Sequence, residues 1–226
     1  MVDEFGVIIQ KGDYGFDYEI FYDIINKRIK DFNLKLYEDL YSLGSGNIGM
    51  NALDLFCLKF FFEENNIQNV LELGCGTTSK FLDILKIQRK TFALDCIYFE
   101  GIEYEKLNLF EEYQTIQKYV ENNIVEFILV DCLHNEKMAE LIFDKILKLS
   151  NFNTPIFIHD WFDFNKETYT EQVYYYNNLF KFYDLYLMTD LPKEFIDKLQ
   201  YDKNSVDEIC HVPRCCAILT PKTWKM

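Results

Sequence analysis

Short apolar segments alternate with amphipathic segments along most of the chain. Runs typical of strands lie at residues 69–74, 91–96, 126–131, 155–160, 184–189 and 214–221, and a further short strand is expected within 102–110. Between them, helices are predicted near residues 50–65, 79–87, 111–121, 135–149 and 168–182. Short, uniformly apolar strands separated by helices are typical of a parallel sheet that is covered on both faces. The pattern therefore predicts a doubly wound α/β sheet.

The first 45 residues follow a different pattern. A short apolar start precedes a predicted helix near residues 18–32, and the turn-rich LGSGN follows at 43–47. No internal repeat, low-complexity tract or proline- and glycine-rich linker interrupts the chain after that point. We expect an N-terminal helical extension or cap over residues 1–45 and one α/β domain over residues 46–226.

The composition of the chain is that of a globular protein. Of its 226 residues, 49% are hydrophobic, which is enough to form a sizeable core. No basic start followed by an apolar run indicates a signal peptide, and no apolar segment approaches the ~20 residues of a membrane span. The seven cysteines show no CxxC spacing, so free thiols in a reducing compartment are expected. These features predict a soluble, cytoplasmic protein.

The net charge restricts the partners of the protein. A formal charge of -14 at pH 7, with Arg28, Arg89 and Arg214 as the only arginines, repels a phosphate backbone over most of the surface. No local basic patch is evident in the sequence. We therefore expect no nucleic acid as a partner, and the lack of a long apolar segment leads us to expect no membrane either.

A glycine turn follows the first of the predicted strands, in the stretch VLELGCGTTSKFL at residues 70–82. Gly74 and Gly76 would let the backbone turn sharply and approach a ligand. Thr78 or Ser79 could cap the next helix, whose free N–H groups favour a carboxylate or a phosphate. Asp95, at the end of the next strand, could accept hydrogen bonds from ribose hydroxyls. A dinucleotide and S-adenosylmethionine both fit this pattern.

Two residues favour S-adenosylmethionine over a dinucleotide. The dinucleotide fingerprint requires a third glycine, and Ser79 occupies that position. Glu72, two residues before the first glycine, would serve a pyrophosphate poorly. Its charge suits the free amino group of S-adenosylmethionine instead.

The segment ELGCGT, together with Asp95, resembles motifs I and II of the class I S-adenosylmethionine-dependent methyltransferases, and the resemblance covers roughly residues 45–220. It implies a Rossmann-like sheet of seven strands, mostly parallel, with an antiparallel final hairpin strand, and it makes residues 46–226 a methyltransferase domain. The residues expected around the methyl donor are Glu72, Gly74, Cys75, Gly76, Thr78, Ser79, Asp95 and Asp131, with Ser45 on a closing loop.

Two later segments are similar to one group of small-molecule and sugar O-methyltransferases. VDCLH resembles the D-G-x-H pattern of that group, with Cys132 in place of the usual glycine, and PIFIHD resembles its H-D pair. The resemblance implies that Asp131, His134, His159 and Asp160 carry the chemistry. A histidine suits removal of a hydroxyl proton because its pKa lies near neutrality.

Each assignment has a plain structural alternative. His134 could be a helix N-terminal residue that is hydrogen-bonded locally, and His159 could point into the sheet. Catechol-type enzymes place carboxylates after strands 4 and 5 around Mg²⁺, and Asp131 and Asp160 match two of those ligands. Trp161 stands where their asparagine would be, so a divalent metal stays an option only. The aromatic residues from Trp161 onward could line an acceptor or could simply pack.

The sequence thus predicts an S-adenosylmethionine-dependent O-methyltransferase that acts on a hydroxyl of a small molecule, with a sugar or glycan preferred. A metal-dependent enzyme for phenolic hydroxyls is the first alternative. An NAD(P)-dependent oxidoreductase and a non-catalytic cofactor-binding module are the others.

Overall fold

The computed structural model describes residues 52–96, 100–159, 161, 166–187 and 217–224. The expected N-terminal extension over residues 1–45, Ser45 and Asp160 lie outside the described residues. Within the described ones, no helix is both long and apolar enough to cross a membrane.

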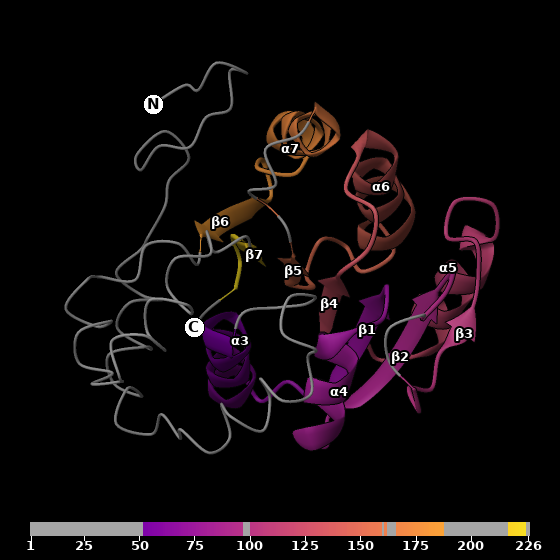
Figure 1. Ribbon diagram of the computed structural model, residues 1–226. Coiled ribbons are helices and arrows are strands. Elements are labelled where there is room, and N and C mark those ends of the chain that lie inside the picture. The colour runs from indigo at the N-terminus through magenta and orange to yellow at the C-terminus, as the bar shows by residue number, and fades with distance from the viewer. Residues whose placement is uncertain (1–51, 97–99, 160, 162–165, 188–216, 225–226) are drawn as a thin grey trace.

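A single mixed sheet organises the described residues (Figure 1). Its strands, in chain order, are β1 Asn69–Leu73, β2 Gln88–Ala93, β3 Glu105–Lys106, β4 Phe127–Val130, β5 Ile156–Ile158, β6 Tyr183–Leu187 and β7 Ala217–Pro221. They lie in the order β3-β2-β1-β4-β5-β7-β6. Strand β7 is antiparallel to both β5 and β6, and every other pair is parallel. The predicted seven-stranded, mostly parallel Rossmann-like sheet with an antiparallel final hairpin strand is confirmed.

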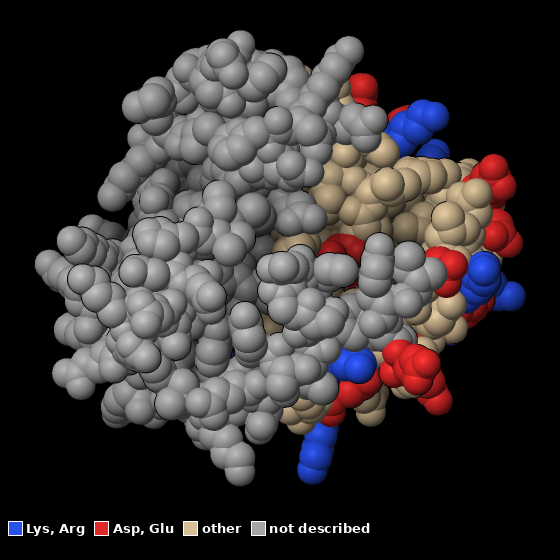
Figure 2. Space-filling view, in the orientation of Figure 1, with Lys and Arg blue, Asp and Glu red and all other residues tan. Residues whose placement is uncertain are grey.

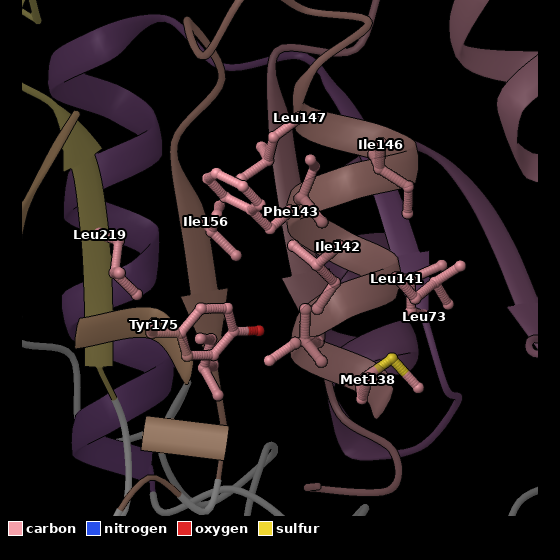
Figure 3. Close-up of a cluster of buried hydrophobic side chains, with 14 of the residues drawn as sticks. Leu73, Met138, Leu141, Ile142, Phe143, Ile146, Leu147, Ile156, Tyr175 and Leu219 are labelled. Carbon is pink, nitrogen blue, oxygen red and sulfur yellow. The ribbon is translucent and has the colours of Figure 1, made fainter. Parts of the chain in front are cut away.

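Helices cover both faces of this sheet. They are α3 Ala52–Asn65, α4 Thr77–Ile84, α5 Tyr113–Asn122, α6 Glu136–Glu140 with its π-helical continuation η2 Leu141–Leu147, and α7 Lys166–Asn178. Alternate residues of each strand face opposite sides, so β1 contributes Val70 to one core and Leu71 to the other. Side chains of α3 and α4 pack in the first core, and those of α5, α6, η2 and α7 in the second. The second core includes Tyr175, which Figure 3 shows beside Leu219 with its hydroxyl directed toward the helix that carries Ile142.

Strand β2 differs from its predicted range. It covers Gln88–Ala93 instead of 91–96. The register explains the shift, because Leu73 at the end of β1 pairs with Phe92, and the chain beyond Gly74 offers no strand for Leu94 and Asp95 to join. The first residues of β2 are polar, which is why the apolar pattern missed them. Asp95 consequently lies in a loop just past the strand.

Charged side chains of both signs are interspersed along the described part of the face in Figure 2. Arg89, in contrast, is a basic residue with a buried side chain. Its side chain is 7% exposed and pairs with Asp83, the Nε–Oδ1 distance being 2.8 Å.

Candidate functional site

The glycine turn packs directly against the end of strand β4. Gly74 follows β1 with φ +97°, a conformation that favours glycine. A Cβ atom at this position would lie 1.8 Å from the backbone oxygen of Asp131. The backbone N–H of Asp131 in turn donates to the carbonyl of Leu73 over 2.9 Å. Gly74 is therefore required by its contact with β4, whatever ligand the turn receives.

Helix α4 begins earlier than predicted, and neither Thr78 nor Ser79 is its N-cap. Gly76 is the N-cap residue and the first helical residue is Thr77. Ser79, in the first turn, accepts a hydrogen bond from the Gly76 N–H over 3.1 Å. The helix still opens at the glycine turn, so its first N–H groups lie at the edge of the sheet where strands β1 and β2 end.

Glu72 is buried inside the protein instead of facing a ligand. Its side chain is fully buried, and its carboxylate accepts hydrogen bonds from the hydroxyls of Ser79 and Thr91. The guanidinium of Arg89 lies 3.7 Å away. Burial raises the pKa of Glu72 to about 7, although these partners pull it downward. The expectation that this carboxylate meets the amino group of a ligand is thus not met.

Cys75 and Cys96 form a disulfide across the open end of strands β1 and β2, with their Cα atoms 5.7 Å apart. The prediction of free thiols is wrong for this pair, because the turn after β1 and the loop after β2 bring residues 21 positions apart together. Asp95 is exposed beside the disulfide, and its Oδ1 accepts a hydrogen bond from the N–H of Cys96 over 2.8 Å.

Asp131 links the glycine turn to the end of strand β5. Its Oδ2 accepts a hydrogen bond from the Thr78 hydroxyl over 3.2 Å, and its Oδ1 lies 3.2 Å from Nδ1 of His159. Burial by itself would raise the pKa of Asp131, but His159 and Thr78 lower it below its ordinary value. Asp131 is therefore an ionised carboxylate held between a residue of α4 and a histidine.

A second histidine–carboxylate pair lies next to the first. Nδ1 of His134 lies 3.1 Å from Oε2 of Glu171, which belongs to α7. Both side chains are nearly inaccessible, at 9% and 1% exposed. Burial raises the pKa of Glu171, and the hydrogen bond with His134 opposes that effect. Cys132 lies in the same cluster, where burial and the carboxylates of Glu171 and Asp131 raise the pKa of its thiol.

Of the described aromatic residues after β5, Trp161, Tyr174 and Tyr175 pack within the protein, whereas Tyr176 is exposed. Trp161 is buried and stacks on Tyr175 at a centroid distance of 6.0 Å, and Tyr175 is itself fully buried. Tyr174 donates a hydrogen bond to Asp144 over 2.8 Å. The plain packing alternative holds for these three residues. Phe162 and Phe164 lie outside the described residues.

The structure brings together most of the predicted site residues that it describes. Thr78, Asp131, His159 and His134 lie at one edge of the sheet, and Gly74, Cys75, Gly76 and Asp95 border them on the side of β2. Among the described residues no group of three His, Cys, Asp or Glu side chains is arranged to hold a metal ion. The second expected metal ligand, Asp160, is not among them.

Sequence reasoning missed Glu171. A signal was present, because Glu171 stands four residues before Tyr175 and eight before Leu179, which puts an acid on the apolar face of a helix. All three side chains are buried in the structure.

Comparison with known proteins gives only distant similarity. No family model and no curated protein matches the sequence. Among solved structures, a protein from Staphylococcus aureus that is described as a caffeoyl-CoA O-methyltransferase is 13% identical with a TM-score of 0.43, covering 90% of this chain and 99% of its own. The MycE methyltransferase of the mycinamycin pathway, in complex with Mg, SAH and mycinamycin VI, is 12% identical with a TM-score of 0.48, covering 96% of this chain and 67% of its own. Similarity this low leaves the function to be argued from the residues of the chain itself.

Proposed function

We propose that this protein is an S-adenosylmethionine-dependent O-methyltransferase that acts on a hydroxyl of a small molecule, with a sugar or glycan as the preferred class. One observation carries the proposal: Asp131 contacts both Thr78 of the glycine-turn helix and His159 at the end of β5. The turn that would receive a methyl donor therefore adjoins the histidines that could deprotonate an acceptor. A sheet with an antiparallel β7 beside β5 also supports a methyltransferase domain over a dinucleotide-binding domain.

The donor fits the edge of the sheet at the ends of β1 and β2. The first N–H groups of α4 could bind its carboxylate, and the exposed carboxylate of Asp95 could accept hydrogen bonds from the ribose. When bound, the donor supplies an electrophilic methyl group on a sulfonium. Glu72 would then support the turn from below, through Ser79, without contacting the donor.

The protein's part in the chemistry is to orient the acceptor and to take its proton. With a donor bound, an acceptor oxygen that took the methyl group from the sulfonium would lose its hydroxyl proton to a histidine nitrogen, leaving the donor as the neutral thioether. His134 and His159 are both candidates because each is paired through Nδ1 with a carboxylate. Asp131 stays ionised and holds His159 in place. A divalent ion bound by Asp131 and Asp160 is the alternative means of activating the hydroxyl.

Transfer of a radiolabelled methyl group to a panel of sugars, hydroxylated macrocycles and catechols tests the proposal. Asp131→Ala should reduce the rate on any accepted substrate by ~10²-fold or more, because the variant removes the contact between the turn and His159. Retention of full activity by both Asp131→Ala and His159→Ala would overturn the catalytic assignment. Loss of turnover in EDTA with these residues intact would favour the metal-dependent alternative.

The net charge and the disulfide bear on the expected partners and on the expected location. The net charge of -14 argues against a nucleic-acid acceptor. The disulfide between Cys75 and Cys96 argues against a cytoplasmic location, because such bonds are rare in reducing compartments. If this protein binds the donor but methylates no acceptor of the panel, the alternative of a non-catalytic cofactor-binding module would hold.

A further inference from the structure

Helix α7 carries a buried acid that the proposed function does not explain. The side chain of Glu171 is 1% exposed, on the helix face that also holds the fully buried Tyr175, and Leu179, just past the end of the helix, is fully buried as well. An ionisable group at such a position is costly unless a partner compensates for its burial. The partner is His134, whose Nδ1 lies 3.1 Å from Oε2 of Glu171. The pair joins α7 to the segment that follows β4, 37 residues apart in the sequence.

The other ring nitrogen of His134 is in a different situation from Nδ1. Nε2 is buried, and among the described residues it has no hydrogen-bond partner. Buried polar atoms of this kind are uncommon and call for an explanation. A ring nitrogen that accepts a proton from a substrate hydroxyl must keep its lone pair free of other hydrogen bonds, which would explain why Nε2 lacks a partner among the described residues.

The groups around His134 define its electrostatic surroundings. Asp131 and Cys132 precede it after β4, Glu171 faces it from α7 with Tyr175 beside Glu171, and His159 lies beyond Asp131 at the end of β5. Thr78 and His159 pair with the two oxygens of Asp131. Glu171 is thus the carboxylate that pairs with His134, as Asp131 is for His159.

We propose that Glu171 is the positioning residue of His134, accepting the Nδ1–H hydrogen bond so that Nε2 keeps its lone pair toward the acceptor hydroxyl. This inference rests on the proposed O-methyltransferase function, in which His134 is the base. The carboxylate fixes the tautomer and the orientation of the ring, and it stabilises the imidazolium that forms when Nε2 takes the proton.

The same distance between the two residues permits the opposite arrangement. A protonated Glu171 would donate to Nδ1, and His134 would then carry its proton on Nε2 and could not act as a base. Burial raises the pKa of Glu171, so this arrangement becomes more populated as the pH falls. The tautomer of His134 near pH 8 therefore decides between the two.

Nuclear magnetic resonance of the full chain with ¹⁵N-labelled histidine rings measures that tautomer directly. The chain has three histidines, so His159→Gln and His211→Gln suffice to assign the signals. We expect the wild-type protein at pH 8 to show a protonated Nδ1 and an unprotonated Nε2 on His134. A wild-type spectrum with the proton of His134 on Nε2 would overturn the proposal, whether or not the Glu171 variant folds.

Glu171→Met removes the acceptor at similar side-chain length, and we expect loss of the Nδ1–H signal of His134. The exposed Glu140→Met on α6 is the matched control and should leave the His134 signals unchanged. An unchanged Nδ1–H signal in Glu171→Met would also overturn the proposal. Calorimetry with S-adenosylhomocysteine on the same samples tests the proposed function separately from the role of Glu171. Failure to bind S-adenosylhomocysteine would contradict the methyltransferase function, whereas the tautomer of His134 tests the role of Glu171.

Discussion

At the scale of single residues, the buried Glu72 makes stability depend on pH. Burial raises its pKa from 4.5 to about 7, so the folded state binds a proton more tightly than the unfolded state does. The resulting stabilisation is fully present below about pH 4.5 and is lost as the pH rises through about 7. The difference amounts to about 3 kcal/mol of unfolding free energy.

The variant Glu72→Gln should remove this dependence. Its free energy of unfolding, measured by urea denaturation at pH 5 and pH 8, should change less with pH than that of the wild type. Comparing the two proteins cancels the opposite contribution of Asp131, whose lowered pKa favours stability at higher pH. Parallel curves for the two proteins would show that Glu72 does not titrate in this range.

Gly74 and Gly101 form a natural pair for testing the glycine turn. Both have positive φ, at +97° and +81°, but a Cβ would strike the Asp131 backbone only at Gly74, since nothing lies within 4 Å at Gly101. Gly101→Ala should cost about 1 kcal/mol from its backbone conformation alone. Gly74→Ala should cost at least about 3 kcal/mol, because the clash is added.

Chemical denaturation of both variants measures the difference. Equal losses of stability would show that the approach of the turn to β4 is not tight. If an excess of S-adenosylhomocysteine restored the stability of Gly74→Ala, the turn would be able to move away from β4.

At the scale of elements, the periodicity of the chain predicted the order and type of the described strands and helices because burial dictates that pattern. The start of β2 could not be predicted, since Gln88 and Arg89 are polar and join the sheet only by pairing with β1. The N-cap of α4 was missed because Gly76 takes that position and the Ser79 hydroxyl satisfies its N–H. These features depend on neighbours that are distant in the sequence.

The candidate site was predictable to a similar degree. The ends of parallel strands bring the glycine turn, Asp131 and His159 to one edge, and this follows from topology alone. The direction of Glu72 and the contribution of Glu171 from α7 depend on side-chain packing. The sequence could indicate Glu171 only as an acid on an apolar helix face.

The disulfide joins two elements, the turn that opens α4 and the loop after β2. Peptide mapping of the unreduced protein should recover Cys75 and Cys96 in one cross-linked species. Reduction should lower the free energy of unfolding by about 3 kcal/mol, because the bond closes a loop of 21 residues in the unfolded chain.

The variants Cys75→Ser and Cys132→Ser separate loss of the disulfide from loss of a free thiol. Reductant should no longer change the free energy of unfolding of Cys75→Ser, but it should still lower that of Cys132→Ser. Recovery of Cys75 and Cys96 as separately alkylated peptides would contradict the bond and would restore the case for a reducing compartment.

At the scale of the whole molecule, the strand order places the glycine turn, which is proposed to bind the donor, and His159, a proposed base, at the same edge of the sheet. The turn between β1 and α4 lies beside the end of β4, and β5 brings His159 to the other side of Asp131. The antiparallel β7 next to β5 distinguishes this sheet from a dinucleotide-binding domain. The account therefore depends most on which ligand this edge binds.

Isothermal titration calorimetry with S-adenosylhomocysteine and with NADH, at equal concentrations on the full chain, tests that claim most directly. We expect one molecule of S-adenosylhomocysteine to bind per chain and NADH to give no heat. Asp95→Ala should weaken the binding by roughly tenfold, because the contact with the ribose is lost. Tight binding of NADH with no binding of S-adenosylhomocysteine would contradict the account.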